Sequence, residues 1–141
     1  CSSANFSIKY SDDIIVDLWH KWVLITTVAG ATTLFNATIG EIASTEHGIA
    51  FITDLHDECI TIAKSEKIKV NDDDLAQQRR FLSDKKSTWS SSMRRDMVNK
   101  SKIECAHIFF ELINIADKNN VECPSLKTVM INGEIYMRSL V

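Results

Sequence analysis

The feature that most constrains the fold is a long segment, residues 14–35, in which apolar side chains recur at the spacing of a helix face. Recurrence at every third and fourth residue predicts an α-helix with one buried side. Ser11 and the two aspartates after it are suited to cap this helix, because carboxylates are favoured in a first helical turn. Gly30 is expected to loosen or bend the helix. The apolar positions are 15, 18, 19, 22, 25, 28 and 29.

The remainder of the chain shows the same periodicity. A stripe of apolar residues marks the segment 44–66, in which His56 and the two acidic residues after it fall on the exposed side. Ser101 and Glu104 have the spacing of a capping box, which predicts the start of another helix. No stretch shows the alternation and turns that are typical of a β-hairpin. The sequence therefore predicts an all-α domain of about five or six helices, the later ones over residues 44–66, 72–86, 93–98, 101–119 and 125–138.

Composition and charge argue against several classes of function. The 141 residues carry a formal net charge of −3, so nucleic acid is not an expected partner. The longest apolar runs are interrupted by Lys21, Thr26, Thr27 and Gly30, and no membrane-spanning segment is predicted. The four cysteines form no Cys-x-x-Cys pair, which is typical of a reduced protein, and we expect a cytoplasmic location.

The start of the chain and its glycines both indicate a piece of something longer. The first residue is Cys1 rather than methionine, and residues 1–10 look like a short, extended lead-in from a preceding domain. The chain has four glycines and no Gly-x-Gly-x-x-Gly motif. That motif forms the turn that cradles a dinucleotide pyrophosphate. We therefore expect no nucleotide-binding unit within these residues.

Three residues are candidates for chemistry, and each has a structural alternative. The helix neighbours of Lys21 are apolar, so its ammonium either reaches out of the core or is held partly out of water, where it could donate a proton. Glu104 fits a capping box, and Ser92 fits the N-cap of the short helix after it, although both could instead face a substrate. The pair His56-x-x-Cys59 lacks a second pair of ligands, so a zinc site is not expected.

Two motifs carry a resemblance to a known family. Ser91-Ser92-Met93, followed by Asp96 and then by Glu104 eight residues later, resembles the signature of the C-terminal domain of ketopantoate reductases, the 2-dehydropantoate 2-reductases. The run Trp19-His20-Lys21 is similar to the Trp-x-Lys of the same family. The resemblance covers essentially the whole chain and implies a helical fold like that of the 6-phosphogluconate dehydrogenase C-terminal domain. It also implies that Lys21 is the catalytic acid, that Glu104 is an active-site carboxylate, and that Ser92 helps to bind the substrate.

The resemblance further implies a function for a complete protein. That function is the NADPH-dependent reduction of a ketopantoate-like 2-keto acid, a small substrate, in pantothenate biosynthesis. The NADPH would be bound mainly by an N-terminal Rossmann domain that precedes residue 1, and a homodimer is one assembly to expect. The substrate domain itself would span residues 1–141.

The chain also departs from the family pattern. The family commonly has asparagines four and eight residues after the lysine, whereas this chain has Ile25 and Ala29. The usual glycine six residues after the glutamate is Phe110. Larger apolar side chains at these places predict a less polar substrate or a loss of activity. The alternative interpretation is a helical interaction module without catalysis, either as a fragment or as a degenerate member of the family.

Overall fold

The computed structural model describes the backbone of residues 2–104 and 106–141, and the side chains of residues 14–104 and 107–141. Within these ranges the chain is helical and contains no strand, so the predicted all-α class is confirmed. The elements are α1 (Ser2–Phe35), α2 (Ile39–Ala43), α3 (Gly48–Ser65), α4 (Asp72–Leu82), α5 (Ser92–Val98), the π-helical turn η1 (Ala106–Phe110), α6 (Glu111–Lys118) and α7 (Pro124–Ser139).

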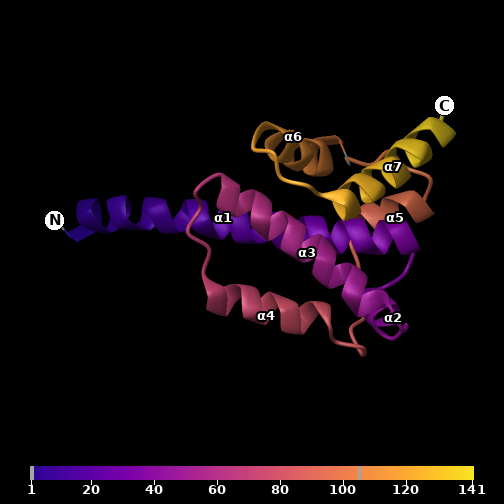
Figure 1. Ribbon diagram of the computed structural model, residues 1–141, viewed down its shortest axis with the longest axis horizontal. Coiled ribbons are helices and arrows are strands. Elements are labelled where there is room, and N and C mark those ends of the chain that lie inside the picture. The colour runs from indigo at the N-terminus through magenta and orange to yellow at the C-terminus, as the bar shows by residue number, and fades with distance from the viewer. Residues whose placement is uncertain (1, 105) are drawn as a thin grey trace.

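The long helix α1 is the axis of the domain. Helices α3 and α7 pack against its length, with α5 near its C-terminal end. Figure 1 shows α4 on one side of this axis and α5, α6 and α7 on the other. The N-terminal end of α1 extends beyond the other helices in the same view. A central helix with partners on several sides explains why the segment 14–35 is so apolar.

The structure corrects the predicted start of α1. The helix begins at Ser2, so residues 2–10 are helical rather than extended, and Ser11 lies inside the helix instead of capping it. The helix continues through Gly30, which lies where α1 meets α3 and α7. A Cβ at Gly30 would lie 3.0 Å from Leu55 Cδ2 and 3.2 Å from the Val129 methyl groups. The glycine thus allows three helices to approach closely, and that packing outweighs its low helix propensity.

The helix predicted over residues 44–66 starts later than expected. Residues 44–47 form the turn that follows α2, and α3 begins at Gly48. A Cβ at Gly48 would lie 1.7 Å from the carbonyl oxygen of Ile42, so only glycine fits this close approach. The predicted capping box was at Ser101, whereas the structure has one at Thr38. The Thr38 hydroxyl accepts the Glu41 N–H, and the Glu41 carboxylate accepts the Thr38 N–H.

The main core forms where α3, η1, α6 and α7 meet α1. Its fully buried side chains include an aromatic ring and several branched aliphatic groups, and the Cys59 and Cys123 thiols are free and buried among them. Burying a side chain of this size stabilises a fold by about 1.5–3 kcal/mol. The central members are Leu55, Ile62, Phe109, Leu112, Leu126 and Val129.

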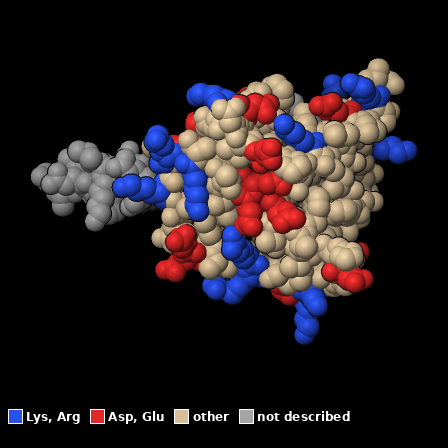
Figure 2. Space-filling view, in the orientation of Figure 1, with Lys and Arg blue, Asp and Glu red and all other residues tan. Residues whose placement is uncertain are grey.

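The segment Ile14–Phe35 of α1 is long and apolar enough to cross a membrane by length and composition, with a mean hydropathy of 1.3. The sequence prediction had placed no such segment in the chain. In the fold this segment is 44% buried over its most apolar window and packs against α3 and α7. It therefore serves as the core helix of the domain. On the face shown in Figure 2, a group of acidic side chains lies near the middle and basic side chains lie mostly around it.

Candidate functional site

A pocket of about 390 Å³ lies where the serine-rich loop before α5 and the coil after α5 meet the middle of α1. We call it the serine pocket. Its lining is apolar where α1, Met93 of α5 and Ile108 of η1 contribute, and mostly polar or charged elsewhere. The apolar lining residues are Ile25, Val28, Ala29, Met93 and Ile108, with Trp89 at the loop, and the polar ones are Ser90, Ser91, Ser92, Asp96, Lys102 and Glu104.

The short helix α2 holds the loop that forms one wall of this pocket. The Ile39 N–H donates to the Trp89 carbonyl at 2.9 Å, and the Gly40 N–H donates to the Ser87 carbonyl at 3.0 Å. These two amides are among the four at a helix start that have no partner within the helix. A Cβ at Gly40 would lie 2.2 Å from the Ser87 oxygen. The absence of a side chain at Gly40 therefore lets the loop dock on α2.

The two adjacent serines Ser91 and Ser92 have different roles. Ser91 is the N-cap of α5, since its hydroxyl accepts the Arg94 N–H at 3.1 Å. The Thr32 hydroxyl donates to the Val28 carbonyl, so the Ser91 hydroxyl donates to Thr32 Oγ1 at 2.8 Å. The prediction that Ser92 caps α5 is therefore wrong, because the contact with Thr32 selects its neighbour. Ser92 lines the pocket, and its hydroxyl makes no hydrogen bond within the described part of the chain.

Glu104 lies in the coil before η1, and the predicted capping box with Ser101 does not form. The backbone carbonyl of Glu104 accepts the N–H groups of His107 and Ile108 at 3.1 and 3.4 Å. Its carboxylate has neither a hydrogen bond nor an ion pair with any side chain that the structure describes. The capping role is thus removed, and the carboxylate lines the serine pocket together with Ser92.

Lys21 lies outside the lining of the serine pocket. It is exposed on α1, one turn before Ile25 and two turns before Ala29, so it shares a helix face with two lining residues. Leu18 and Ile25, its neighbours on that face, are 59% and 41% exposed. The structure therefore brings Ser92 and Glu104 together and places Lys21 beyond the α1 side of the pocket. The functional roles of all three residues stay predictions.

The family model "Ketopantoate reductase PanE/ApbA C terminal" matches residues 13–131 of the chain. The chain belongs to this family. The uncharacterized oxidoreductase YkpB of Bacillus subtilis is 30% identical over 135 residues, which cover 96% of this chain and 45% of that protein. The 2-dehydropantoate 2-reductase of Streptococcus pyogenes is 22% identical over 102 residues, which cover 72% of this chain and 33% of that protein. The chain therefore spans less than half the length of these relatives.

Two solved structures share the fold. The dimeric ketopantoate reductase of Staphylococcus aureus aligns with a TM-score of 0.80 at 17% identity, over 91% of this chain and 45% of that one. A ternary structure of D-mandelate dehydrogenase with NADH and anilino(oxo)acetate aligns with a TM-score of 0.77 at 19% identity, over 92% of this chain and 43% of that one. The helical domain described above is thus the fold of the ketopantoate reductase C-terminal domain.

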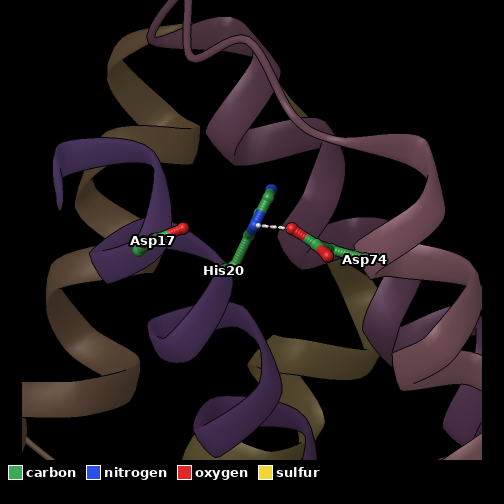
Figure 3. A group of neighbouring side chains, drawn as sticks. All are labelled: Asp17, His20 and Asp74. Atoms are coloured by element: carbon green, nitrogen blue, oxygen red, sulfur yellow. Dashed lines mark ion pairs between the residues drawn. The ribbon is translucent and has the colours of Figure 1, made fainter. Parts of the chain in front are cut away.

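Sequence reasoning missed a cluster of Asp17, His20 and Asp74, whose potential ligand atoms lie within 4.8 Å of one another (Figure 3). The buried His20 ring accepts the Asn71 N–H on Nε2 at 3.1 Å, so its proton is on Nδ1, which faces Asp74 Oδ2 at 3.5 Å. A metal ion would need a lone pair on Nδ1, and this hydrogen-bonding pattern leaves none there. The cluster instead ties α1 to the first turn of α4.

A buried polar chain continues from this cluster to α3. The Gln78 amide N–H donates to the His20 carbonyl at 3.0 Å, and His56 Nε2 donates to the Gln78 amide oxygen at 2.8 Å. His56 is fully buried, so its predicted place on the exposed side of the helix is wrong. Burial lowers the pKa of His56, and burial raises the pKa of the Cys59 thiol. This neighbourhood thus holds α4 on the core.

Proposed function

We propose that this chain supplies the substrate pocket of an oxidoreductase that reduces a 2-keto acid with a nicotinamide cofactor, NADPH by preference. The observation that carries the proposal is the meeting of Ser92 and Glu104 in one pocket. These residues have the spacing of the family signature, and neither side chain has a structural partner among the described residues. Family membership gives the class of reaction, because the relatives are oxidoreductases.

The residues of the pocket suggest distinct roles in that reaction. The Ser92 hydroxyl can donate a hydrogen bond to the substrate, and the Glu104 carboxylate can accept one from a substrate hydroxyl or from a protonated group. Lys21 has the reach of a long, flexible side chain and would give a proton to the carbonyl oxygen as it becomes a hydroxyl. NADPH, when bound, supplies the hydride that adds to the carbonyl carbon. The described residues contain no strand and no glycine-rich turn, so the dinucleotide would be held by a separate domain.

The apolar side of the pocket supports a particular kind of substrate. Ile25 and Ala29 stand where the family commonly has asparagines, and Val28, Met93 and Ile108 extend the same apolar wall. Burying apolar substrate surface against this wall contributes about 25 cal/mol per Å². The structural relative solved with anilino(oxo)acetate is a D-mandelate dehydrogenase. We therefore favour a 2-keto acid with a branched or aromatic substituent over ketopantoate, whose hydroxyl would lose polar contacts.

A second candidate is a non-catalytic helical interaction module, which the replacement of both asparagines favours. The two candidates differ in whether the complete protein would catalyse a reaction. The relatives are more than twice as long as this chain, which leaves room for the proposed nucleotide-binding domain. A homodimer belongs to the proposal as well, since the Staphylococcus aureus relative is described as dimeric. A cytoplasmic location and a place in pantothenate biosynthesis stay predictions.

The test is a kinetic assay on the full-length parent protein. Oxidation of NADPH and of NADH is followed with a panel of branched, aromatic and hydroxylated 2-keto acids. We expect turnover with at least one apolar substrate at a higher kcat/KM than with ketopantoate. As a control, calorimetric titration of this 141-residue chain should show no saturable NADPH binding. A full-length protein that binds NADPH but reduces no 2-keto acid would favour the interaction module, and tight NADPH binding by this chain would contradict the division between domains.

A further inference from the structure

We propose that Lys102 supplies the cation that binds the substrate carboxylate in the serine pocket. This inference deepens the proposed function, on which it rests for the substrate, and it explains how the pocket would select 2-keto acids over neutral carbonyl compounds. It starts from the lining itself. Among the described lining residues Lys102 alone is basic, whereas Lys21, the lysine singled out by its sequence context, is not part of the lining.

The other charged residues of the pocket are acidic, so an anionic substrate needs a cation there. Asp96 and Glu104 both line it, so an anionic substrate would meet two carboxylates. Two like charges about 4 Å apart repel by roughly 1 kcal/mol even in bulk water, and by more near protein. Neither arginine of α5 lines the pocket, and Arg94 is already engaged with Asn36 Oδ1 at 3.1 Å and with Ser90 Oγ at 3.2 Å. Lys102 is therefore the residue that can offset the repulsion.

The ammonium of Lys102 is available for a ligand. It forms neither an ion pair nor a hydrogen bond with any side chain that the structure describes. By comparison, the Lys127 ammonium lies 3.4 Å from an Asp117 carboxylate oxygen. A lysine that already has a carboxylate partner would have to give it up to bind a substrate. Lys102 has no such partner among the described side chains, so its ammonium could bind an incoming carboxylate as a point charge.

The backbone on both sides of Lys102 is anchored. The Ser101 N–H donates to the Asp96 carbonyl at 2.8 Å, and the Tyr136 hydroxyl donates to the Ser101 carbonyl at 2.6 Å. On the other side Ile103 is buried, and its N–H donates to the Met137 sulfur at 3.5 Å. Contacts with α5 and α7 thus fix where Lys102 leaves the chain, while its side chain is exposed. An anchored backbone with an exposed side chain suits a residue that binds a ligand.

These positions orient a 2-keto acid by three contacts. Its carboxylate would lie against Lys102, its carbonyl oxygen would accept from Ser92, and its substituent would lie against the apolar wall from α1. The neutral methyl ester of the same acid keeps the last two contacts and loses the first. Comparing an acid with its ester therefore isolates the contribution of the Lys102 charge.

The test is a binding titration of this chain that uses the fluorescence of Trp89, a lining residue, with 3-methyl-2-oxobutanoate and its methyl ester as probes. The Trp89→Phe variant assigns the signal to the pocket. Lys102→Met should weaken binding of the acid about tenfold, which is about 1.4 kcal/mol, and should leave binding of the ester within about twofold. Lys102→Glu should weaken the acid further. Lys69→Met, an exposed lysine in the linker between α3 and α4, is the matched control and should change neither.

Three results would overturn the proposal. The first is that the unmodified chain does not bind the acid, and the second is that it binds acid and ester with equal affinity. The third is that Lys102→Met weakens binding of both probes equally. In the full-length enzyme, the same variant should raise KM for the acid with little change in kcat. If that enzyme reduces no 2-keto acid while the chain still selects acid over ester through Lys102, then the proposed function fails and the carboxylate site stands.

Discussion

Single side chains acquire their roles in this domain from what lies opposite them in the fold. Ser91 and Ser92 are equally good N-caps by residue type, and Thr32 on α1 decides between them by accepting the Ser91 hydroxyl. Glu104 is likewise suited to a capping box, yet its coil is drawn toward α5 and α7 and its carboxylate is left for the pocket. The sequence could identify these residues as candidates, but the choice between their roles depends on contacts that are distant along the chain.

The buried His56 predicts a dependence of stability on pH. Because burial lowers its pKa below 6.5, the folded state binds fewer protons than the unfolded state as pH falls through that value. The stabilising contribution of neutral His56 should therefore be fully present above about pH 6.5, and the free energy of unfolding should decrease below that pH. The His56→Gln variant lacks the titrating group. Between about pH 7.5 and 5.5, its free energy of unfolding should fall by about 1 kcal/mol less than that of the wild type.

Chemical denaturation of the wild type and the variant over this pH range measures the effect. His47 offers a matched control, since its side chain is 89% exposed and lies outside the core. His47→Gln should follow the wild-type pH profile. Parallel profiles for wild type and His56→Gln would show that the burial of His56 has no influence on proton binding in the folded state.

At the scale of elements, apolar periodicity located the helices well and their ends poorly. The predicted 93–98 and 125–138 segments correspond to α5 and α7 with ends within about two residues. The predicted starts of the helices over residues 14–35, 44–66 and 101–119 were wrong. In each case tertiary contacts decided the outcome. Ile103, for example, is buried and gives its N–H to Met137, so its segment cannot start a helix where the capping-box pattern predicted one.

The docking of the serine-rich loop on α2 predicts an unusually costly glycine substitution. Gly40→Ala places a Cβ against the Ser87 backbone, which cannot move without breaking the two hydrogen bonds that hold the loop. We expect a loss of about 2–3 kcal/mol in the free energy of unfolding, together with weaker ligand binding in the serine pocket. Gly30→Ala is the control, because its Cβ would meet the ends of the Leu55 and Val129 side chains, and it should cost less. Equal losses for the two variants in urea denaturation would contradict this view of the loop.

At the scale of the whole molecule, the serine pocket exists because α1 gathers three chain segments that are far apart in sequence. Its lining comes from α1, from the loop and start of α5, and from the segment that leads into η1. Resemblance to a family could point to Ser92 and Glu104 in advance. It could not show that Ile108 and Lys102 join them, or that α4 is held by a buried chain through His20 and Gln78. Both of these depend on side chains that meet only in the folded chain.

The central claim is that the serine pocket is the active site of a 2-keto acid reductase and that the Glu104 carboxylate acts there in the transition state. Its most direct test is the kcat/KM of Glu104→Gln in the full-length protein, with NADPH and the best 2-keto acid from the panel. The carboxylate has no partner among the described residues, so the thermal midpoint should not change. We predict a fall in kcat/KM of at least about tenfold, or about 1.4 kcal/mol of transition-state binding. Glu111→Gln, on the first turn of α6 and outside the lining, should retain full activity. An unchanged kcat/KM for Glu104→Gln would contradict the account.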